Sequence, residues 1–517
     1  MSLVREAGSK SVAHFSTPYR GTWQAVSAHQ LTGDALYNSM NVFLREGKLR
    51  ARPGLLLLNN TTFESPVLGG VMAVTANDKI LIAITKDKCY ELGSSGGPNA
   101  LWVPTSSGTY ATNDDTVVDI TITQLGTGVV GVVASPGHLL KKWLIGAGLS
   151  EITPLPGQTI PIAKSVCTSG RRIVALVEPH TVRWTSVLTY NDWNPLATAN
   201  VSSTNDEGIC VVSLSNLAFV LYKERSIYLA RAQAGSNATA FNFAEPINVE
   251  GPAGVHAVVN IHGAHMYMTK NGRIGSFDGT RYPQWIADGL WLFLQSDIDP
   301  VYSSKIFGVY DYRLHTAIFY YPRVGDAGSL KGMVVINLPL EGGGILEGRS
   351  LDQAAIYLGT LPASFLGVAT RPCSYGYEMR FDGRIDQSLL FTTDSLHSCN
   401  LAETVRSDDG LSFTSSFQTG LATLPDMVHH QLNVESWLER TNGYGFVTVS
   451  AVTSDTLDLP GGTVDLANPQ VVDLNVNPVR EYIAFNIPTR FFGLRYEWDS
   501  LSTVKYAGVS VYGRAVA

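Results

Sequence analysis

The sequence predicts an all-β protein, a β-propeller of six or seven blades followed by a C-terminal antiparallel β-sandwich-like domain. Three observations lead to this fold class. Short apolar runs joined by tight turns recur along most of the chain, glycine is abundant at 49 residues, and segments typical of helices are few. The runs are rich in β-branched and aromatic residues, which favour strands.

Seven segments share one hydrophobic pattern, in which an apolar run, a polar or Gly/Pro turn and a second apolar run follow one another. They recur about every 40–50 residues, the period of a propeller blade, and each blade buries both faces against its neighbours. The segments begin at Lys79, Val129, Arg172, Leu217, His265, Thr316 and Ala354. A β-sandwich or a series of unrelated hairpins is the alternative interpretation.

Two local features refine this prediction. Residues 269–273 read Thr-Lys-Asn-Gly-Arg, and Asn-Gly supplies the positive φ that a two-residue hairpin turn needs. Residues 288–298 predict one short helix after the cap-like Asp288.

Beyond about residue 400 the strands alternate apolar and polar residues, as in Val447-Thr448-Val449-Ser450. Alternation is typical of an antiparallel sheet with one buried and one solvated face. The strand-like segments are 411–420, 429–440, 445–453, 481–489, 491–500 and 506–517. A further hairpin, with its turn at Asp382-Gly383, precedes them.

We therefore divide the chain into three parts. Residues 1–60 are an N-terminal segment and hairpin that join the propeller, and residues 61–370 are the propeller itself. Residues 371–517 are the C-terminal β domain, whose start can contribute a returning propeller strand.

Composition excludes several classes of protein. The 37 basic and 44 acidic residues give a net charge of −7, which is not that of a general nucleic-acid binder. The 5 cysteines are scattered without a CxxC pair, so we expect folding in a reducing cytoplasm. We expect no signal peptide and no membrane-spanning segment, because no apolar run approaches the ~18 residues that a span needs.

The search for catalytic motifs finds neither a P-loop nor a nucleophile elbow. His262 and His265 lie three residues apart, which puts them on opposite faces of a strand and argues against a metal site. Ser186 and Trp193 have the spacing of a sialidase turn, but the residues between them depart from that motif. We therefore interpret this segment as a blade turn with a packed tryptophan.

Two pairs of carboxylates are also candidates for chemistry. Asp297 and Asp299 could do acid–base work or bind Ca²⁺, or simply mark a helix end and a turn before Pro300. Asp408 and Asp409 predict a solvated turn. We predict no catalytic, cofactor-binding or metal-binding residues, and no enzyme.

Three cations, Lys48, Arg50 and Arg52, lie two residues apart, a spacing that puts them on one face of a strand. With a two-residue turn at 46–47, the hairpin pairs Arg45 with Lys48, Leu44 with Leu49, Phe43 with Arg50 and Val42 with Ala51. The cationic face is then a solvated hairpin face, where charge discourages unwanted strand pairing. A contact with a neighbouring subunit or adaptor, for which these three are the candidate interface residues, and a contact with DNA are the alternatives.

Three groups of short motifs carry a family resemblance. They are Asn41-Val42 with Gly47-Lys48-Leu49-Arg50 and Arg52-Pro53-Gly54; Val182–Ser186 with Asp192–Pro195; and Phe219–Tyr222 with Ser226–Tyr228. Together they resemble the tail nozzle proteins of short-tailed phages, the group that includes tail tubular protein B and the packaged-DNA stabilisation protein. The resemblance covers about residues 38–280 by motif, and beyond that only the order of a propeller and a β domain.

The resemblance implies a structural virion protein without cofactors. Such proteins form a homo-oligomeric ring, usually a hexamer, at the distal end of the tail. The ring docks onto a tail adaptor protein, supports tail fibres or spikes, and closes and conducts the path of genomic DNA without sequence-specific binding. We accordingly expect this protein in the virion tail, assembled in the host cytoplasm. A propeller that binds or hydrolyses glycans is the alternative.

Overall fold

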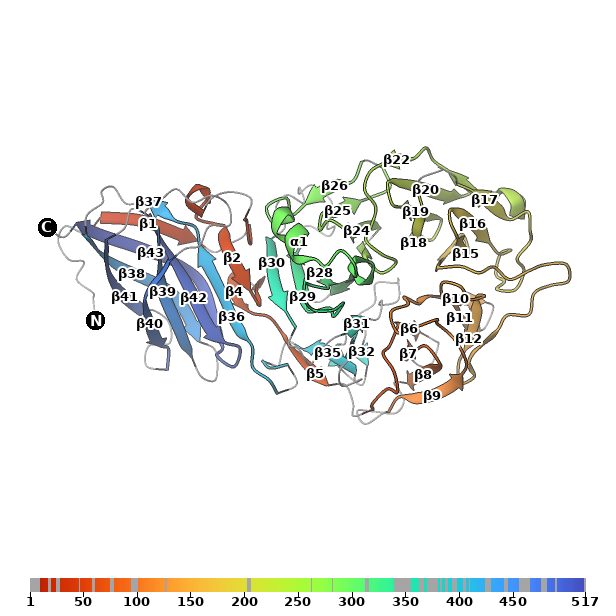
Figure 1. The fold of residues 1–517 in the computed structure, drawn as a ribbon, viewed down its shortest axis with the longest axis horizontal. Helices are drawn as coiled ribbons and strands as arrows, with labels where there is room; N and C mark the ends of the chain where they lie inside the picture. Colours follow the sequence, from red (N-terminus) through yellow and green to blue (C-terminus); the bar gives the residue numbers. More distant parts are fainter. Residues whose placement is uncertain are drawn as a thin grey trace.

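The computed structural model describes residues 10–515 with internal gaps. The gaps are residues 17–19, 25–27, 46, 58–60, 75–78, 94–100, 126–127, 202–205, 262, 281, 312–315, 339–354, 362–366, 370–379, 382–383, 386–388, 393–397, 403–405, 409, 424–428, 441–444, 455–464, 476–480 and 489–490. The chain folds into a β-propeller and a two-sheet β domain that lie side by side (Figure 1).

The propeller consists of seven antiparallel blades in the part of the chain that the structure describes. Blade 1 contains β6 (Gly69–Val74), β7 (Lys79–Ile84), β8 (Lys88–Gly93) and β9 (Val103–Ser107). Blade 2 contains β10 (Asp119–Leu125), β11 (Gly128–Ala134), β12 (Lys141–Leu144) and β13 (Gly148–Glu151). Blade 3 contains β14 (Ser165–Ser169), β15 (Arg172–Val177), β16 (Thr181–Trp184) and β17 (Thr198–Asn200).

The next three blades follow in chain order. Blade 4 contains β18 (Gly208–Ser215), β19 (Ala218–Lys223), β20 (Ser226–Ala232) and β21 (Phe241–Phe243), with β22 (Ile247–Asn248) also paired to β20. Blade 5 contains β23 (Val258–Ile261), β24 (Ala264–Met268), β25 (Ile274–Phe277) and β26 (Gln284–Ile286). Blade 6 contains β27 (Phe307–Asp311), β28 (Thr316–Tyr321), β29 (Gly332–Asn337) and β30 (Ala355–Thr360).

Blade 7 closes the ring with strands from both ends of the propeller. It contains β31 (Gly367–Ala369), β34 (Leu389–Thr392), β35 (Ser398–Ala402) and, as its outermost strand, β5 (Gly54–Leu57). A small hairpin of β32 (Arg380–Phe381) and β33 (Arg384–Ile385) lies between β31 and β34 in the chain. The innermost strands β6, β10, β14, β18, β23, β27 and β31 contact one another in this order, and β31 contacts β6. The ring of blades is thereby closed, and each blade keeps only a short outer edge.

Six of the seven predicted repeats are confirmed as the second and third strands of blades 1 to 6. The segment that begins at Ala354 is not a hairpin. Its first run is β30, the last strand of blade 6, and its second run lies mostly outside the described residues, directly before β31, the first strand of blade 7. Two apolar runs in successive strands of neighbouring blades give the same hydrophobic pattern as the two strands of a hairpin.

The turn at 269–273 is a hairpin, but it contains three residues rather than two. Thr269 and Arg273 close it through a backbone hydrogen bond of 2.8 Å, and Gly272 alone has a positive φ, of 78°. This is the arrangement in which a type I turn is followed by a left-handed glycine. The predicted helix is α1 (Trp291–Asp297), whose N-cap is Leu290, so the capping role expected of Asp288 was wrong. Short 3-10 turns lie at η1 (Ala28–Gln30), η3 (Asn237–Thr239) and η4 (Ser303–Lys305).

The β domain contains two antiparallel sheets. Sheet 1 has the order β3 (Val42–Arg45), β4 (Lys48–Ala51), β43 (Val504–Ala515), β38 (His429–Arg440) and β41 (Glu481–Pro488), with β1 (Lys10–Ser16) also paired to β43. Sheet 2 has the order β2 (Leu36–Met40), β36 (Thr414–Thr419), β42 (Phe491–Asp499), β39 (Phe446–Ser454) and β40 (Asp465–Asp473), with β37 (Ala422–Thr423) also paired to β42.

One hydrophobic core joins the two sheets. Phe417 of sheet 2 stacks on Tyr496 with ring centroids 4.8 Å apart, and it also contacts Tyr506 of sheet 1 at 4.6 Å. The Tyr496 hydroxyl reaches Ser436 Oγ of sheet 1 at 2.6 Å, which satisfies both buried groups. The same core continues into blade 6 through Val335 and neighbouring residues. The propeller and the β domain therefore share buried apolar surface.

The sequence missed β40, and the reason is Pro469. Proline cannot donate a ladder hydrogen bond and is confined to the edges of sheets, which makes such a strand hard to recognise. β40 is the edge strand of sheet 2.

The two parts exchange strands at the boundaries that we expected near residues 60 and 370. The hairpin of β3 and β4, which we expected to join the propeller, pairs with β43 in the β domain. β5, which follows it immediately, is the strand that joins the propeller. β34 and β35 also belong to blade 7, so the chain returns to the β domain only after Ala402. The hairpin lies in the β domain because β4 pairs with β43 beside Tyr506. Apolar side chains of the hairpin and of β43 also belong to the same hydrophobic core.

Blades 2, 3 and 4 are linked by buried polar groups at their innermost strands. Asp119 Oδ2 accepts hydrogen bonds from Ser165 Oγ at 2.7 Å and from the Val166 N–H at 3.0 Å. Ser165 Oγ in turn accepts from the Val211 N–H at 3.1 Å. Asp119 is fully buried, so its charge is stabilised by these donors rather than by water.

We predict that Asp119→Ala lowers the free energy of unfolding by about 2–4 kcal/mol, because Ser165 and Val166 lose their acceptor inside the protein. Urea unfolding followed by tryptophan fluorescence measures the change. Asp278→Ala, in an exposed turn, is the matched control and stays within about 0.5 kcal/mol of the wild type. Equal effects of the two substitutions would contradict the role of Asp119 as a buried acceptor that links the blades.

Candidate functional site

The predicted register of the hairpin that carries Lys48 and Arg50 is confirmed. Val42 pairs with Ala51, Phe43 with Arg50, Leu44 with Leu49 and Arg45 with Lys48. Lys48 and Arg50 are half-buried, whereas Arg52 is only 1% exposed. The expectation that all three cations form one solvated face was therefore wrong for Arg52.

Arg52 forms a buried ion pair with Asp408, which is 0% exposed. Its Nη1 donates to Asp408 Oδ1 at 2.9 Å and to the Pro53 carbonyl at 2.9 Å, and its Nη2 donates to Asp408 Oδ2 and to the Thr360 carbonyl at 3.0 Å. Nε donates to Asn41 Oδ1 at 3.1 Å. All five guanidinium N–H groups thus have an acceptor, which a buried arginine requires.

Asn41 completes this contact from the start of the hairpin. Its φ is +56°, a left-handed conformation that asparagine tolerates better than most residues. Its N–H donates to the Leu358 carbonyl at 2.9 Å, and its Oδ1 accepts from the Thr360 N–H at 2.8 Å. Asn41 therefore ties the hairpin of the β domain to β30 of blade 6.

Gly54 is required in the same region. A Cβ atom at this position would lie 2.2 Å from the Ser407 carbonyl oxygen. Only glycine allows the chain to pass so close to the segment that carries Asp408. We call Asn41, Arg52, Gly54, Thr360 and Asp408 the junction. Asp408 does begin a turn, closed by the Leu411 N–H on the Asp408 carbonyl at 3.0 Å, but its side chain is buried rather than solvated, and Asp409 lies outside the described residues.

Lys48, at the turn end of β4, forms an ion pair with Glu439 of β38. The hydrogen bond from Lys48 lowers the pKa of the Glu439 carboxyl, with further contributions from the charges of Lys48, Lys505 and Arg50, while partial burial opposes the shift.

The other candidate residues have structural partners. His265 is fully buried; its Nε2 donates to the Ser213 carbonyl at 2.9 Å, and its Nδ1 lies 2.9 Å from the Tyr222 hydroxyl. His262 lies outside the described residues. Trp193 is also fully buried, and its Nε1 donates to the Tyr190 carbonyl at 2.9 Å, as expected of a packed blade turn.

The two carboxylates at the end of α1 have different surroundings. Asp297 accepts from Arg323 Nε at 3.0 Å and from the Tyr321 hydroxyl at 2.8 Å. Asp299 accepts from the Val301 N–H at 3.0 Å and so stabilises the turn at Pro300. In the described parts of the chain, no three His, Cys, Asp or Glu side chains gather as metal ligands would.

A second candidate region lies on the face of the propeller that carries the segments preceding the innermost strands. We call it the upper face. Three cavities of about 220, 500 and 560 Å³ follow one another there. The first two share Asp115, Thr116 and Val117, and the last two share Ile209, Glu224 and Lys270.

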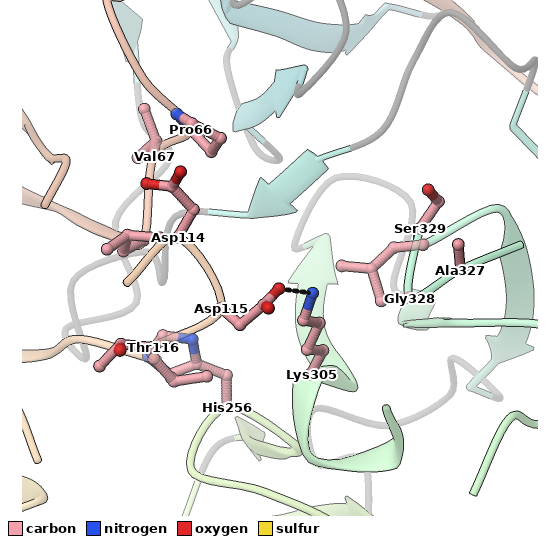
Figure 2. Close-up of a pocket in the computed structure, with 13 residues that line it drawn as sticks. Pro66, Val67, Asp114, Asp115, Thr116, His256, Lys305, Ala327, Gly328 and Ser329 are labelled. Atoms are coloured by element: carbon pink, nitrogen blue, oxygen red, sulfur yellow. Dashed lines mark hydrogen bonds and ion pairs between the residues drawn. The ribbon is translucent and has the colours of Figure 1, made fainter. Parts of the chain in front are cut away.

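Two contacts on the upper face cross the propeller axis. Figure 2 shows Lys305, just before blade 6, in an ion pair with Asp115, just before blade 2. His256, just before blade 5, has its Nε2 3.9 Å from Asp119 Oδ1 of blade 2. These blades are not neighbours in the ring. Side chains of non-neighbouring blades therefore meet across the propeller axis on the upper face.

Ion pairs also link neighbouring blades around the upper face. Lys86 of blade 1 lies 3.4 Å from Asp114, before blade 2, and Lys270 of blade 5 lies 2.9 Å from Glu224 of blade 4. The hydrogen bond from Lys270 lowers the pKa of Glu224, against a smaller opposing effect of burial. These ion-pair partners could not be predicted from the sequence, because a charged residue in a loop has no local pattern that indicates its partner.

No protein-family model and no curated protein sequence matches this chain. Among solved structures, it is similar to Raptor of Chaetomium thermophilum, with a TM-score of 0.40 and 9% identity over 70% of this chain and 30% of that chain. It is also similar to the WD40 β-propeller domain of Doa1, with a TM-score of 0.39 and 12% identity over 67% of this chain and 96% of that domain. This chain thus spans about 30% of the length of Raptor. No helix in the described residues is long and apolar enough to cross a membrane.

We predict that Arg52→Ala lowers the free energy of unfolding by about 3–5 kcal/mol, because it leaves the buried Asp408 charge unpaired. In a double-mutant cycle with Asp408→Ala, the coupling energy is about 1–3 kcal/mol, measured by chemical denaturation. Lys48→Ala, which breaks a half-exposed pair, changes stability by about 1 kcal/mol or less. An Arg52 effect no larger than the Lys48 effect would refute the importance of the junction.

The Glu224–Lys270 pair predicts a pH dependence. Because the folded pKa of Glu224 lies below its ordinary value of 4.5, the pair stabilises the protein above that pH. The contribution is lost as the pH falls through the lowered pKa. We therefore expect Lys270→Ala to be less stable than the wild type at neutral pH, and the difference to vanish in acid.

Thermal unfolding across this pH range measures the difference, and NMR titration of Glu224 follows its pKa directly. Arg231→Ala, at an exposed position of β20, is the control, and its difference from the wild type is independent of pH. A Lys270→Ala difference that persists in acid would show that the lysine acts through packing alone.

Proposed function

We propose that this protein is a structural virion protein of a short-tailed phage, a component of the tail nozzle or tube. In this proposal several copies form a ring at the distal end of the tail, a hexamer by resemblance. The ring binds a tail adaptor protein, supports fibres or spikes, and conducts and closes the path of DNA.

The observation that supports the proposal most is the role of the motif residues at the junction. Asn41, Arg52 and Gly54 belong to the stretch that resembles the nozzle family, and all three hold the propeller against the β domain. The motif residues thus have a structural role at the contact between the propeller and the β domain, and this role supports the proposal.

The contacts across the propeller axis add a constraint on the proposed conduit. Contacts between Lys305 and Asp115, and between His256 and Asp119, occupy the centre of the propeller. A DNA duplex therefore passes between copies of the chain, in a channel that only a ring can form. The net charge of −7 suits such a channel, because each basic contact with phosphate adds affinity and slows passage.

The proposal predicts that the purified full-length chain forms closed rings, alone or with its adaptor, and that it lies in the tail of intact virions. Negative-stain imaging and light scattering test the ring, and gold-labelled antibody against this chain tests its place in the virion. Virions that lack the chain, or that carry it away from the tail, would overturn the proposal. Turnover or binding on a glycan panel would instead support the alternative of a glycan-binding or glycan-hydrolysing propeller.

A further inference from the structure

Arg273, the last residue of the 269–273 turn of blade 5, is packed against two tryptophan rings. Its Cζ atom is 4.2 Å from the ring centroid of Trp291 in α1 and 5.4 Å from that of Trp285 in β26. A guanidinium group stacks favourably on an aromatic face, and the stacking restricts the orientation of its plane. The turn, the helix and β26 thus hold one cation at a defined position.

The guanidinium of Arg273 has no acidic partner in the described residues. It forms no ion pair and no hydrogen bond there, and only the backbone N–H of Arg273 donates, to Thr269 Oγ1 at 3.2 Å. Lys270 in the same turn is paired with Glu224. Arg273 is half-buried, and its two Nη groups remain accessible, whereas its Nε is buried. One accessible positive charge therefore lies beside α1 without a counter-charge.

Two buried donors next to this charge also lack an acceptor. Nε of Arg273 and Nε1 of Trp291 are buried and have no hydrogen-bond partner within the part of the chain that the structure describes. Because Nε is bonded to Cζ and Nε1 belongs to the stacked ring, both donors flank the same stacking contact. Buried donors are normally hydrogen-bonded, so two of them beside a free cation favour an acceptor from outside the chain.

We propose that Arg273 and Trp291 form a binding site for the carboxylate group of a ligand. The planar guanidinium offers paired N–H donors that match the two oxygens of a carboxylate. Stacking already restricts the side chain, so little conformational entropy is lost when the ligand binds. A carboxylate carries one negative charge, which matches the one free cation, whereas a phosphate monoester carries about −1.5 to −2 at pH 7. The site does not depend on the proposed role in a phage tail.

The test uses the full-length chain with acetate as the probe, followed by saturation-transfer NMR of the acetate methyl protons. Sodium chloride keeps the ionic strength constant, so that screening does not change during the titration. We expect acetate to bind saturably. Arg273→Gln removes the charge and the paired donors, and it weakens binding about tenfold or more.

Three further variants separate a directed site from general attraction. Arg273→Lys keeps the charge but loses the planar pair of donors, and it weakens binding about threefold or more. Trp291→Leu removes the stacked ring and its N–H, and it weakens binding by a similar factor. Arg231→Gln removes the same charge at an exposed position of β20 and leaves the affinity within about twofold of the wild type. Thermal unfolding shows whether each variant is folded, and Arg273→Lys carries the test if Arg273→Gln does not fold.

Binding that Arg273→Gln leaves unchanged, or that Arg273→Gln and Arg231→Gln weaken equally, would overturn the proposal. Equal affinity of the wild type and Arg273→Lys would also overturn it, because charge alone would then attract acetate. Tighter binding of inorganic phosphate, with the same dependence on Arg273, would replace the carboxylate with a phosphate group. A capped tripeptide with a central glutamate identifies the source of the carboxylate. Competition of this peptide with acetate supports a protein ligand, and acetate binding without such competition supports a small-molecule ligand.

Discussion

The buried ion pair between Arg52 and Asp408 is the contact on which the arrangement of the two domains depends. A buried charge pair contributes little unless every donor and acceptor is satisfied, and here all five guanidinium donors have acceptors. The pair therefore acts mainly by specifying one arrangement, since any displacement leaves charges unpaired. The chain passes this point twice, on its way into the propeller at Gly54 and on its way out near Asp408.

The closure of the propeller follows from the same geometry. β5 can complete blade 7 only because the chain leaves the hairpin next to the segment that returns from blade 7. The propeller is thus held at its closing blade by a strand whose other end is fixed in the β domain. Blade 6 shares a hydrophobic core with both sheets of the β domain. The contact between the propeller and the β domain therefore combines this apolar core with the polar junction. Loss of the core or of the junction would loosen both the ring of blades and the contact between the domains.

The charges of the upper face act within one chain. On the upper face, lysines from one blade neutralise carboxylates from another, so the charges stabilise the ring across its axis. Lys48 and Glu439 form a similar ion pair between two strands of sheet 1. In both places, the ion pair joins strands or blades that the backbone alone does not hold together.

The sequence by itself determined the class of the fold and much of its local structure. The alternation and spacing of apolar residues predicted six blade hairpins, the register of the 42–51 hairpin and strands such as β38, because these patterns are local. Tertiary structure alone decided which sheet receives the hairpin, which strand closes blade 7 and which of three similar cations is buried. Lys48, Arg50 and Arg52 have the same spacing and similar chemistry, yet Lys48 and Arg50 are half-buried, whereas Arg52 is 1% exposed and pairs with a buried carboxylate 356 positions away. No local pattern encodes that partner, because the meeting of distant loops depends on the packing of the whole chain.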